Sequence, residues 1–385
     1  MDGSIGPLVA ADEGFCHQIA DTFAIVGQSD LSWTEKVCAM AAARDGSLQI
    51  GFGLGKYANR NVMDGYGGIS RGVEQITVRS SRRLAPRPDH TVVGPLQYEV
   101  IKPLHQIRFA LEANACQPIA FDFTFESIVP PTLEPRTHQR TSYRTTGDLV
   151  RYHQTGVASG WVEVDGERTE ITPDTWVSTR DHSWGVRYDV GQAIADLEPS
   201  EDLSGVAFRL LWSPVYMEKP DGTQYALFLN YRMFDAAGYR SKEVAAAIEH
   251  PNGLSERIVD IEPDLRYDPA NRRLLGGTLQ CTLADGTERP LEIEAVSDTG
   301  FHLGAGLYFG LDGHHHGGWR GKRFVEGERI EDCSTPENAR RLHQIRDTVI
   351  HVVDPVGGGE GWGNCQPIVT GGDPALGLSA DDSFI

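Results

Sequence analysis

The sequence predicts an all-β fold of antiparallel strands, and two observations support this. Four Asp-Gly pairs, at residues 45–46, 165–166, 221–222 and 285–286, each lie between stretches of β-type sequence. This pair favours two-residue hairpin turns, because both residues tolerate positive φ. Apolar and polar residues also alternate along several stretches, which is typical of strands with one buried face.

The elements follow from these patterns in chain order. Alternation predicts strands over residues 98–100, 121–126, 279–283 and 291–295. Helix signals are few: Thr335 followed by Pro336 predicts a short helix as far as Leu342, because a capping residue and a first-turn proline favour a helix start. Residues 347–354 alternate again and predict a further strand.

The 385 residues are enough for two domains. We expect one β domain over residues 1–190 and another over residues 191–370. The boundary should fall within 189–204, where the sequence turns acidic and loses its alternation. Residues 371–385 are predicted to be a disordered acidic tail.

Composition excludes some classes of partner. The 35 Lys and Arg against 54 Asp and Glu give a net charge of −19, which argues against nucleic acid or an anionic membrane surface as partner. Residues 1–4 do not resemble the start of a signal peptide, and no apolar stretch approaches the length of a membrane span. The cysteines are scattered without a CxxC pair, so we expect reduced thiols and a cytoplasmic location; they are Cys16, Cys38, Cys116, Cys281, Cys333 and Cys365.

The run from Thr179 to Arg187 is the strongest candidate for a functional site. It holds Arg180, Asp181, His182, Trp184 and Arg187, and burying such charges is costly unless they are paired. Asp181 is either a general acid or base, or part of a buried ion pair between two domains. On a regular strand Asp181 and His182 face opposite sides, so only one of them would point into a given cavity.

Other motifs give weaker signals. The three histidines His314, His315 and His316 suggest a metal, but consecutive residues do not readily converge on one ion, so we expect a loop and no metal site. Residues 51–68 read as a long glycine-rich hairpin loop with Asn59 and Tyr66 as polar tips. The chain has no Gly-x-Ser-x-Gly elbow, phosphate loop or dinucleotide fingerprint.

Three segments carry a resemblance to a known superfamily. Residues 154–187, with their Arg-Asp-His-Ser-Trp-Gly core, resemble the tandem lipocalin-like proteins, which include AttH-like proteins, carotenoid 1,2-hydratases and fungal lipocalin-like pericyclases. Residues 94–100 and 316–321 resemble recurring segments of its uncharacterised bacterial members. The resemblance covers roughly residues 20–370. It implies two tandem calycin-type β-barrels or sandwiches that meet at a cavity.

The resemblance also implies a role for the aspartate. In carotenoid hydratases an aspartate of the corresponding motif is thought to protonate an alkene, and here that residue is Asp181. Trp184 and Tyr231 would then stabilise a developing cation through their π faces.

We therefore expect a cofactor-independent lyase, hydratase or isomerase that acts on a hydrophobic isoprenoid, steroid or aromatic compound. Asp181 and His182 are the predicted catalytic residues. The predicted substrate-binding residues are Arg180, Trp184, Arg187, Trp212, Tyr231, Asn59, Tyr66, His316, Trp319 and Arg320. The alternatives are a lipocalin-like carrier that binds such a compound without turning it over, and a metal enzyme centred on the three histidines.

Overall fold

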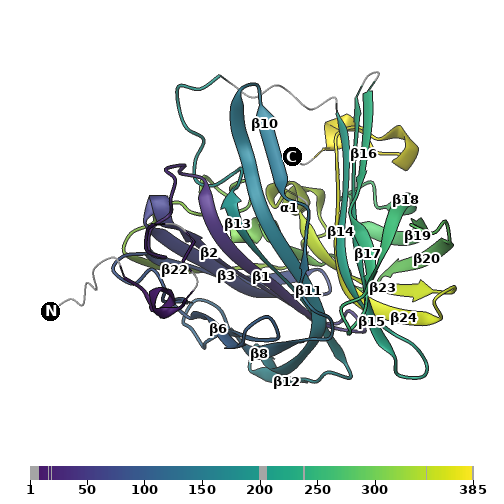
Figure 1. The fold of residues 1–385 in the computed structure, drawn as a ribbon, viewed down its shortest axis with the longest axis horizontal. Helices are drawn as coiled ribbons and strands as arrows, with labels where there is room; N and C mark the ends of the chain where they lie inside the picture. Colours follow the sequence, from purple (N-terminus) through teal and green to yellow (C-terminus); the bar gives the residue numbers. More distant parts are fainter. Residues whose placement is uncertain are drawn as a thin grey trace.

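The computed structural model describes residues 8–15, 17–18, 20–198, 206–236, 239–343 and 345–383. Strands dominate and form two large antiparallel sheets, one mainly from each half of the chain (Figure 1). The predicted all-β fold with few short helices is confirmed. Residues 1–4, on which the expectation of no signal peptide rested, lie outside the described residues.

The first sheet is curled and contains 14 strands within the described residues. Its main order is β22-β4-β3-β2-β1-β13-β11-β8-β7-β6-β5, and β9, β10 and β12 also pair with the long strand β11. The strands are β1 (Trp33–Ala43), β2 (Gln49–Tyr57), β3 (Val62–Arg71), β4 (Glu74–Arg83), β5 (Val92–Val93), β6 (Leu96–Lys102), β7 (Gln106–Leu111), β8 (Ile119–Ser127), β9 (Thr132–Leu133), β10 (Thr137–Thr141), β11 (Arg144–Val164), β12 (Glu167–Ile171), β13 (Trp176–Val186) and β22 (Arg323–Ile330).

The second sheet closes into a barrel. Its order is β14-β24-β23-β20-β19-β18-β17-β15, and β15 pairs back onto β14, which completes the ring; β16 and β21 add to its edges. The strands are β14 (Ala207–Glu218), β15 (Gln224–Ala236), β16 (Tyr239–Val244), β17 (Ala246–Glu249), β18 (Ser255–Tyr267), β19 (Leu274–Leu283), β20 (Glu288–Ala295), β21 (Phe301–His302), β23 (Arg346–Asp354) and β24 (Gly359–Thr370).

The helices are short and lie between or after the strands. They are the α-helix α1 (Pro336–Arg341) and the 3-10 helices η1 (Ala10–Glu13), η2 (Ala58–Arg60), η3 (Leu303–Gly306), η4 (Pro374–Leu376) and η5 (Ala380–Asp382). The Thr335 hydroxyl accepts a hydrogen bond from the Asn338 N–H at 3.2 Å, and Pro336 is the first residue of α1. The predicted helix start is confirmed. In the described part of the chain no helix is long and apolar enough to cross a membrane.

All four Asp-Gly pairs lie in connections between paired strands, but only Asp165-Gly166 forms the predicted two-residue turn. In the other three only the glycine has positive φ, and its N–H donates to the carbonyl three residues before it. The four pairs connect β1 to β2, β11 to β12, β14 to β15, and β19 to β20. At Asp165 and Gly166 both φ values are positive, 54° and 84°, and this conformation matches the twist of the flanking strands.

Residues 51–68 differ from the prediction of a long loop. They lie in strands β2 and β3, joined by the short helix η2. The glycines are needed because large rings cross the strands: a Cβ on Gly53 would lie 2.4 Å from the Tyr66 ring, and one on Gly51 would lie 2.6 Å from the Phe301 ring. The many glycines suggested a loop, because the sequence does not show that side chains from other strands fill the space beside them.

Each sheet has its own apolar core. In the first sheet, odd-numbered residues of β1 such as Val37 and Ala39 pack with Phe52, Phe109 and Phe123 on one face. In the second, residues such as Leu211, Leu229 and Ile350 fill the barrel. The alternate residues of β1, β13, β14 and β23 therefore face away from these cores, and they meet between the two sheets.

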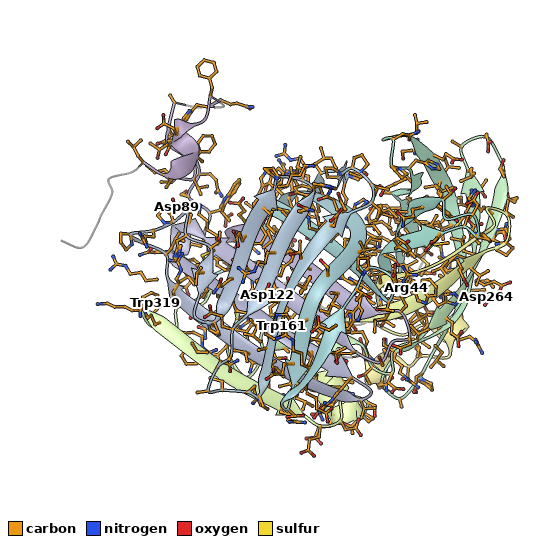
Figure 2. All side chains as sticks on the ribbon, turned by 90° about the horizontal axis from the view of Figure 1, so that it is seen from below. Arg44, Asp89, Asp122, Trp161, Asp264 and Trp319 are labelled. Carbon is orange, nitrogen blue, oxygen red and sulfur yellow. The ribbon has the colours of Figure 1, made fainter. Side chains whose placement is uncertain are left out.

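The two sheets are joined by direct contacts. The Arg44 guanidinium lies over the rings of Tyr216 and Trp362, at 5.0 and 4.9 Å from the ring centroids, and Figure 2 shows it at the boundary of the two sheets. The His153 imidazole, which is fully buried, stacks on the Phe228 ring at 3.5 Å. Such desolvated aromatic and cationic contacts hold the sheets in a fixed arrangement.

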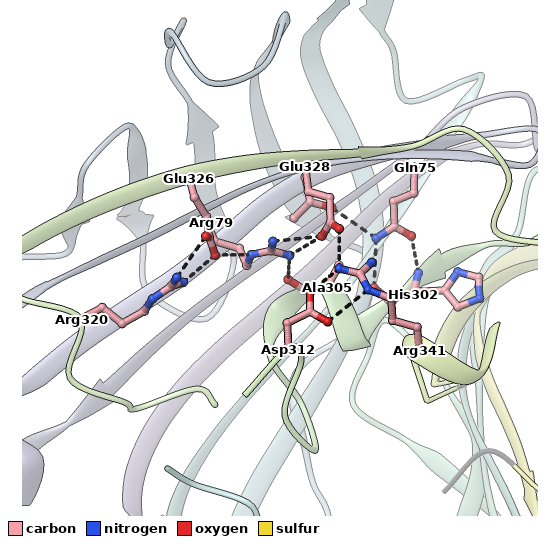
Figure 3. A network of polar contacts seen from close by, with 10 residues as sticks. Gln75, Arg79, His302, Ala305, Asp312, Arg320, Glu326, Glu328 and Arg341 are labelled. Atoms are coloured by element: carbon pink, nitrogen blue, oxygen red, sulfur yellow. Dashed lines mark hydrogen bonds and ion pairs between the residues drawn. The ribbon is translucent and has the colours of Figure 1, made fainter. Parts of the chain in front are cut away.

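A segment from the second half of the chain also joins the first sheet. Strand β22 pairs with β4 over eight residue pairs, and a network of ion pairs fastens the neighbouring loop (Figure 3). Arg79 binds Glu326 at 2.8 Å and Glu328 at 3.0 Å, and Arg341 binds Glu328 at 2.6 Å. The predicted division at residues 190 and 191 stays a prediction, but the sheets themselves do not follow it strictly.

The predicted disordered tail is wrong for residues 371–383. This stretch contains η4 and η5, and Asp373 is buried in a bidentate ion pair with Arg209, at 2.5 and 2.7 Å. Acidic composition suggested a solvated end, but one of its carboxylates has a specific buried partner. Residues 384 and 385 lie outside the described part.

Candidate active site

A cavity of about 280 Å³ lies between the two sheets. Strands β1, β11 and β13 form one wall, and β14, β15, β23 and β24 form the other. The connection after β13 and the loop around η3 close it with Tyr188, Leu303, Tyr308 and Phe309. The volume suits a small organic molecule.

Asp181 projects into this cavity from β13. Its partner in the register of β1 is Cys38, which also lines the cavity. Burial raises the pKa of the Asp181 carboxyl, while the guanidiniums of Arg151 and Arg187 act in the opposite direction. Within the described residues the carboxyl has no hydrogen-bond partner and no ion pair in contact, so its oxygens are available to a ligand.

A second carboxyl, that of Asp347, faces the same cavity from β23. Its side chain is 6% exposed, and its Oδ1 accepts a hydrogen bond from the Gln366 amide at 2.9 Å. Burial raises the pKa of Asp347 to about 7, and the nearby charge of Asp181 contributes to the rise. Near neutral pH the Asp347 carboxyl can therefore hold a proton.

Sequence reasoning missed Asp347. A weak signal existed, because Asp347 begins the alternating run over 347–354 and shares its face with Val349. That valine packs on Met40 and Ala42 of the first sheet, so an aspartate on the same face must lie between the sheets.

Glu134 organises the wall beside Asp181. Its carboxylate accepts a hydrogen bond from the Trp212 indole at 3.0 Å and from Arg151 at 3.2 Å. It also lies 3.4 Å from His153, whose other ring nitrogen is 3.0 Å from Glu249. Trp212 and Arg151 both line the cavity, so the hydrogen bonds of Glu134 hold one side chain of each cavity wall in place.

The remaining wall is largely apolar. The rings of Phe208 and Phe234 pack on each other at 4.7 Å, and those of Tyr188 and Phe309 at 5.7 Å. Leu210, Leu303, Ile345 and Ile368 complete this surface. The rest of the lining carries charged side chains, which also include Arg232 and Glu243, so the cavity suits a ligand with an apolar body and polar groups.

The cluster around residue 181 divides between two faces of β13, as its alternation predicted. His182 lies on the opposite face from Asp181, within 3.0 Å of Glu35 and 3.2 Å of the Tyr152 hydroxyl. Trp184 packs there against the His182 ring. Neither lines the cavity, so the geometry does not bring His182 to a reacting group beside Asp181.

The two arginines predicted to bind substrate, Arg180 and Arg187, also point in different directions. Arg180 borders the cavity, but its guanidinium is buried on the other face, where it donates to the Gln154 amide oxygen and to the Tyr152 hydroxyl at 3.3 Å. Arg187 lines the cavity and donates to the Ser183 hydroxyl at 2.8 Å. Of the predicted aromatics, Trp212 lines the cavity, whereas Tyr231 packs inside the second barrel.

Two further predicted residues have structural contacts. The Asn59 amide donates to the carbonyls of Gln28 and Asp30 at 2.9 and 2.8 Å, which anchors the chain before β1. Tyr66 is buried outside the main cavity, where its ring stacks on Phe301 at 5.9 Å. The Asn59 amide thus has partners within the fold, and the Tyr66 ring is packed in the interior.

The region 314–320 holds no common site for its predicted residues. His316 is buried between the Tyr57 hydroxyl, at 2.9 Å, and Asp189, at 3.2 Å. Trp319 is 59% exposed and lies at the edge of the molecule (Figure 2). Arg320 is paired with Glu326 at 2.5 Å (Figure 3). Among the described residues no group of three or more His, Cys, Asp or Glu side chains could hold a metal ion.

The architecture defines the class as a β protein of two tandem lipocalin-like units, one a closed eight-strand barrel and the other a curled sheet. A family described as a family of unknown function (DUF8625) matches residues 8–377, and the chain belongs to this family. No curated protein matches the chain.

Several solved structures are similar to this chain over most of its length. One is a putative AttH from Nitrosomonas europaea, with 12% identity, a TM-score of 0.43, and coverage of 87% of this chain and 92% of that chain. Kievitone hydratase from Nectria haematococca has 11% identity, a TM-score of 0.42 and coverage of 90% and 93%. CghA with Sch210972 has 11% identity, a TM-score of 0.47 and coverage of 88% of each chain.

Proposed function

We propose that this protein is an acid–base enzyme that acts on a small hydrophobic compound in the cavity between its two sheets. The observation that carries the proposal is the pair Asp181 and Asp347, whose carboxyls face one cavity from different sheets. Structural stability alone gives no reason to bury two carboxyls without a cationic partner in contact, because an unpaired buried charge is costly.

The surroundings assign different roles to the two carboxyls. Asp347 has a pKa of about 7 because it is buried, so it keeps its proton near neutral pH and acts as the acid. Asp181 is nearer Arg151 and Arg187, which favour its carboxylate, so it acts as the base. Trp212 and Phe208 line the same cavity.

An acid and a base on opposite walls support reactions that remove a proton at one atom and deliver one at another. Hydration, dehydration, isomerisation and C–C lysis of an isoprenoid, steroid or aromatic compound all meet this description. Proton transfer by a positioned side chain contributes roughly 10²–10⁴-fold to such rates. His182, which we expected to assist, has no part in this proposal because it faces the other side of β13.

The test incubates the protein with a panel of terpenoid, steroid and diaryl compounds and follows both bound compound and product by mass spectrometry. For any compound converted, Asp181→Asn and Asp347→Asn should each lower turnover by roughly 10²-fold or more while binding stays within a few-fold. Asp264→Asn is the matched control, because Asp264 is exposed on β18 at the far edge of the second barrel (Figure 2).

The pH profile gives an independent check. Turnover should fall as the pH rises above about 7, because Asp347 then loses the proton that it donates. Tight binding of a panel compound without any conversion would contradict the enzyme and leave the alternative, a carrier that uses the same apolar wall.

A further inference from the structure

Arg187 is a buried cation at the cavity without an ion-pair partner in contact. Its Nη2 donates to the Ser183 hydroxyl at 2.8 Å, and its Nε–H is buried with no hydrogen-bond partner among the described residues. No carboxylate of the described chain lies within ion-pair distance of the guanidinium. Burial opposes the charge of Arg187, but nearby groups, Asp189 and Asp181 among them, raise its pKa. The guanidinium therefore stays charged, and its unpaired Nε–H is available to an oxygen anion of a ligand.

Two of the neighbouring carboxylates have other partners, whereas Asp181 has none in contact and interacts with Arg187 only through its charge. Asp189 accepts a hydrogen bond from the Phe309 N–H at 2.9 Å and lies 3.2 Å from the His316 ring. Glu134, on the same side as Arg151, is held by Trp212 and His153. Arg187 is thus left to face the cavity, with its planar guanidinium suited to binding an oxygen anion.

The opposite part of the cavity is suited to an apolar group. The rings of Phe208, Phe234 and Phe309, with Leu210 and Ile368, provide this surface. A ligand that satisfied both parts would have a hydrophobic body and an anionic oxygen at one end.

We propose that the cavity selects hydrophobic compounds that carry an anionic oxygen, as in a carboxylate or an enolate, and that Arg187 binds this oxygen. The inference rests on the proposed function in placing a hydrophobic compound in the same cavity. It adds a chemical class of ligand and a binding residue, and it concerns affinity instead of turnover.

The test measures binding by isothermal titration calorimetry with two probes of the same shape, 1-naphthoate and 1-naphthylmethanol. The intact protein should bind 1-naphthoate at least tenfold more tightly, because hydrogen bonds to charged groups are roughly twice as strong as neutral ones. Arg187→Gln should abolish this preference, and Arg187→Lys should keep part of it, because it retains the charge but loses the bidentate geometry. Arg168→Gln, a change at an exposed arginine of β12, should leave the preference unchanged.

Asp181→Asn separates this inference from the proposed enzyme. The variant should keep the preference for 1-naphthoate even though it loses turnover, because Arg187 remains in place. Equal affinity of the intact protein for the two probes, or no measurable binding of 1-naphthoate, would overturn the inference whether or not Arg187→Gln folds. A preference that persists in a folded Arg187→Gln variant would overturn the role of Arg187.

Discussion

Replacing Asp347 by asparagine should stabilise the protein at high pH. The ordinary pKa of an aspartate is 3.8, and burial raises that of Asp347 to about 7 in the folded protein. Each pKa unit corresponds to about 1.4 kcal/mol, so keeping this carboxyl ionised in the fold costs about 4 kcal/mol. Asparagine has a similar shape, and its amide oxygen can still accept the hydrogen bond from Gln366.

The sign of the pH dependence follows from proton binding. Between pH 3.8 and about 7 the folded protein binds a proton at Asp347 that the unfolded chain has released. The free energy of unfolding contributed by this group therefore falls as the pH rises through that window. The difference between Asp347→Asn and the intact protein should be small at pH 4, and should grow to about 4 kcal/mol in favour of the variant by pH 8.

Urea denaturation at pH values from 4 to 8 measures this difference directly. Asp264→Asn serves as the control, because an exposed carboxyl should give a difference that stays nearly constant over the same range. A difference for Asp347→Asn that does not change with pH, or a variant less stable than the intact protein at pH 8, would refute the assignment of a buried, proton-retaining carboxyl to this position.

Three further predictions test the surroundings of the site. His153→Phe should lower the free energy of unfolding by roughly 3–5 kcal/mol at pH 6, because it leaves Glu134 and Glu249 buried without their shared cation. Burial opposes protonation of His153, but the two carboxylates outweigh burial and raise its pKa. The stabilisation by His153 is therefore complete below pH 6.5 and is lost as the pH rises through the raised pKa. Urea denaturation that shows no loss of stability in the variant at pH 6 would contradict this prediction. Gly46→Ala should lower the free energy of unfolding clearly more than Gly222→Ala. Both glycines have positive φ, 73° and 81°, but only at Gly46 would the new Cβ lie 2.1 Å from a carbonyl oxygen, that of Val296. Equal losses in urea denaturation would show that the contact between Gly46 and Val296 is not tight. Burial raises the pKa of the Cys38 thiol to about 11. Iodoacetamide at pH 8 should therefore alkylate Cys38 much more slowly in the folded than in the urea-unfolded protein. Similar rates, measured by peptide mass spectrometry, would contradict the burial of this thiol at the cavity wall.

Local patterns in the sequence predicted the fold well. All four Asp-Gly pairs connect paired strands, although only at Asp165-Gly166 do both residues adopt the predicted positive φ. Alternation around residues 121–126 and 291–295 likewise marked β8 and β20. The glycine-rich stretch 51–68 could not be recognised as strands, because its glycines make room for the rings of Tyr66 and Phe301, and the sequence does not show that these rings lie there.

The site could be predicted only in part. Asp181 and Arg187 stand out in a dense polar cluster, and alternation showed that His182 faces the other way. Asp347 lies 166 positions further along the chain, and its carboxyl faces the same cavity as Asp181 only because β23 packs its outer face on the first sheet. Which residues of the two sheets face each other depends on long-range packing, and the alternation within one strand does not reveal it.

The central claim is that Asp181 and Asp347 move protons to and from a hydrophobic compound. The measurement that tests it most directly is deuterium incorporation, by mass spectrometry, into bound terpenoid, steroid and diaryl compounds during incubation in D₂O. We predict that the intact protein introduces non-exchangeable deuterium into at least one compound, and that Asp181→Asn and Asp347→Asn bind the same compound without introducing it. Compounds that bind tightly and are recovered without deuterium from the intact protein would contradict the claim.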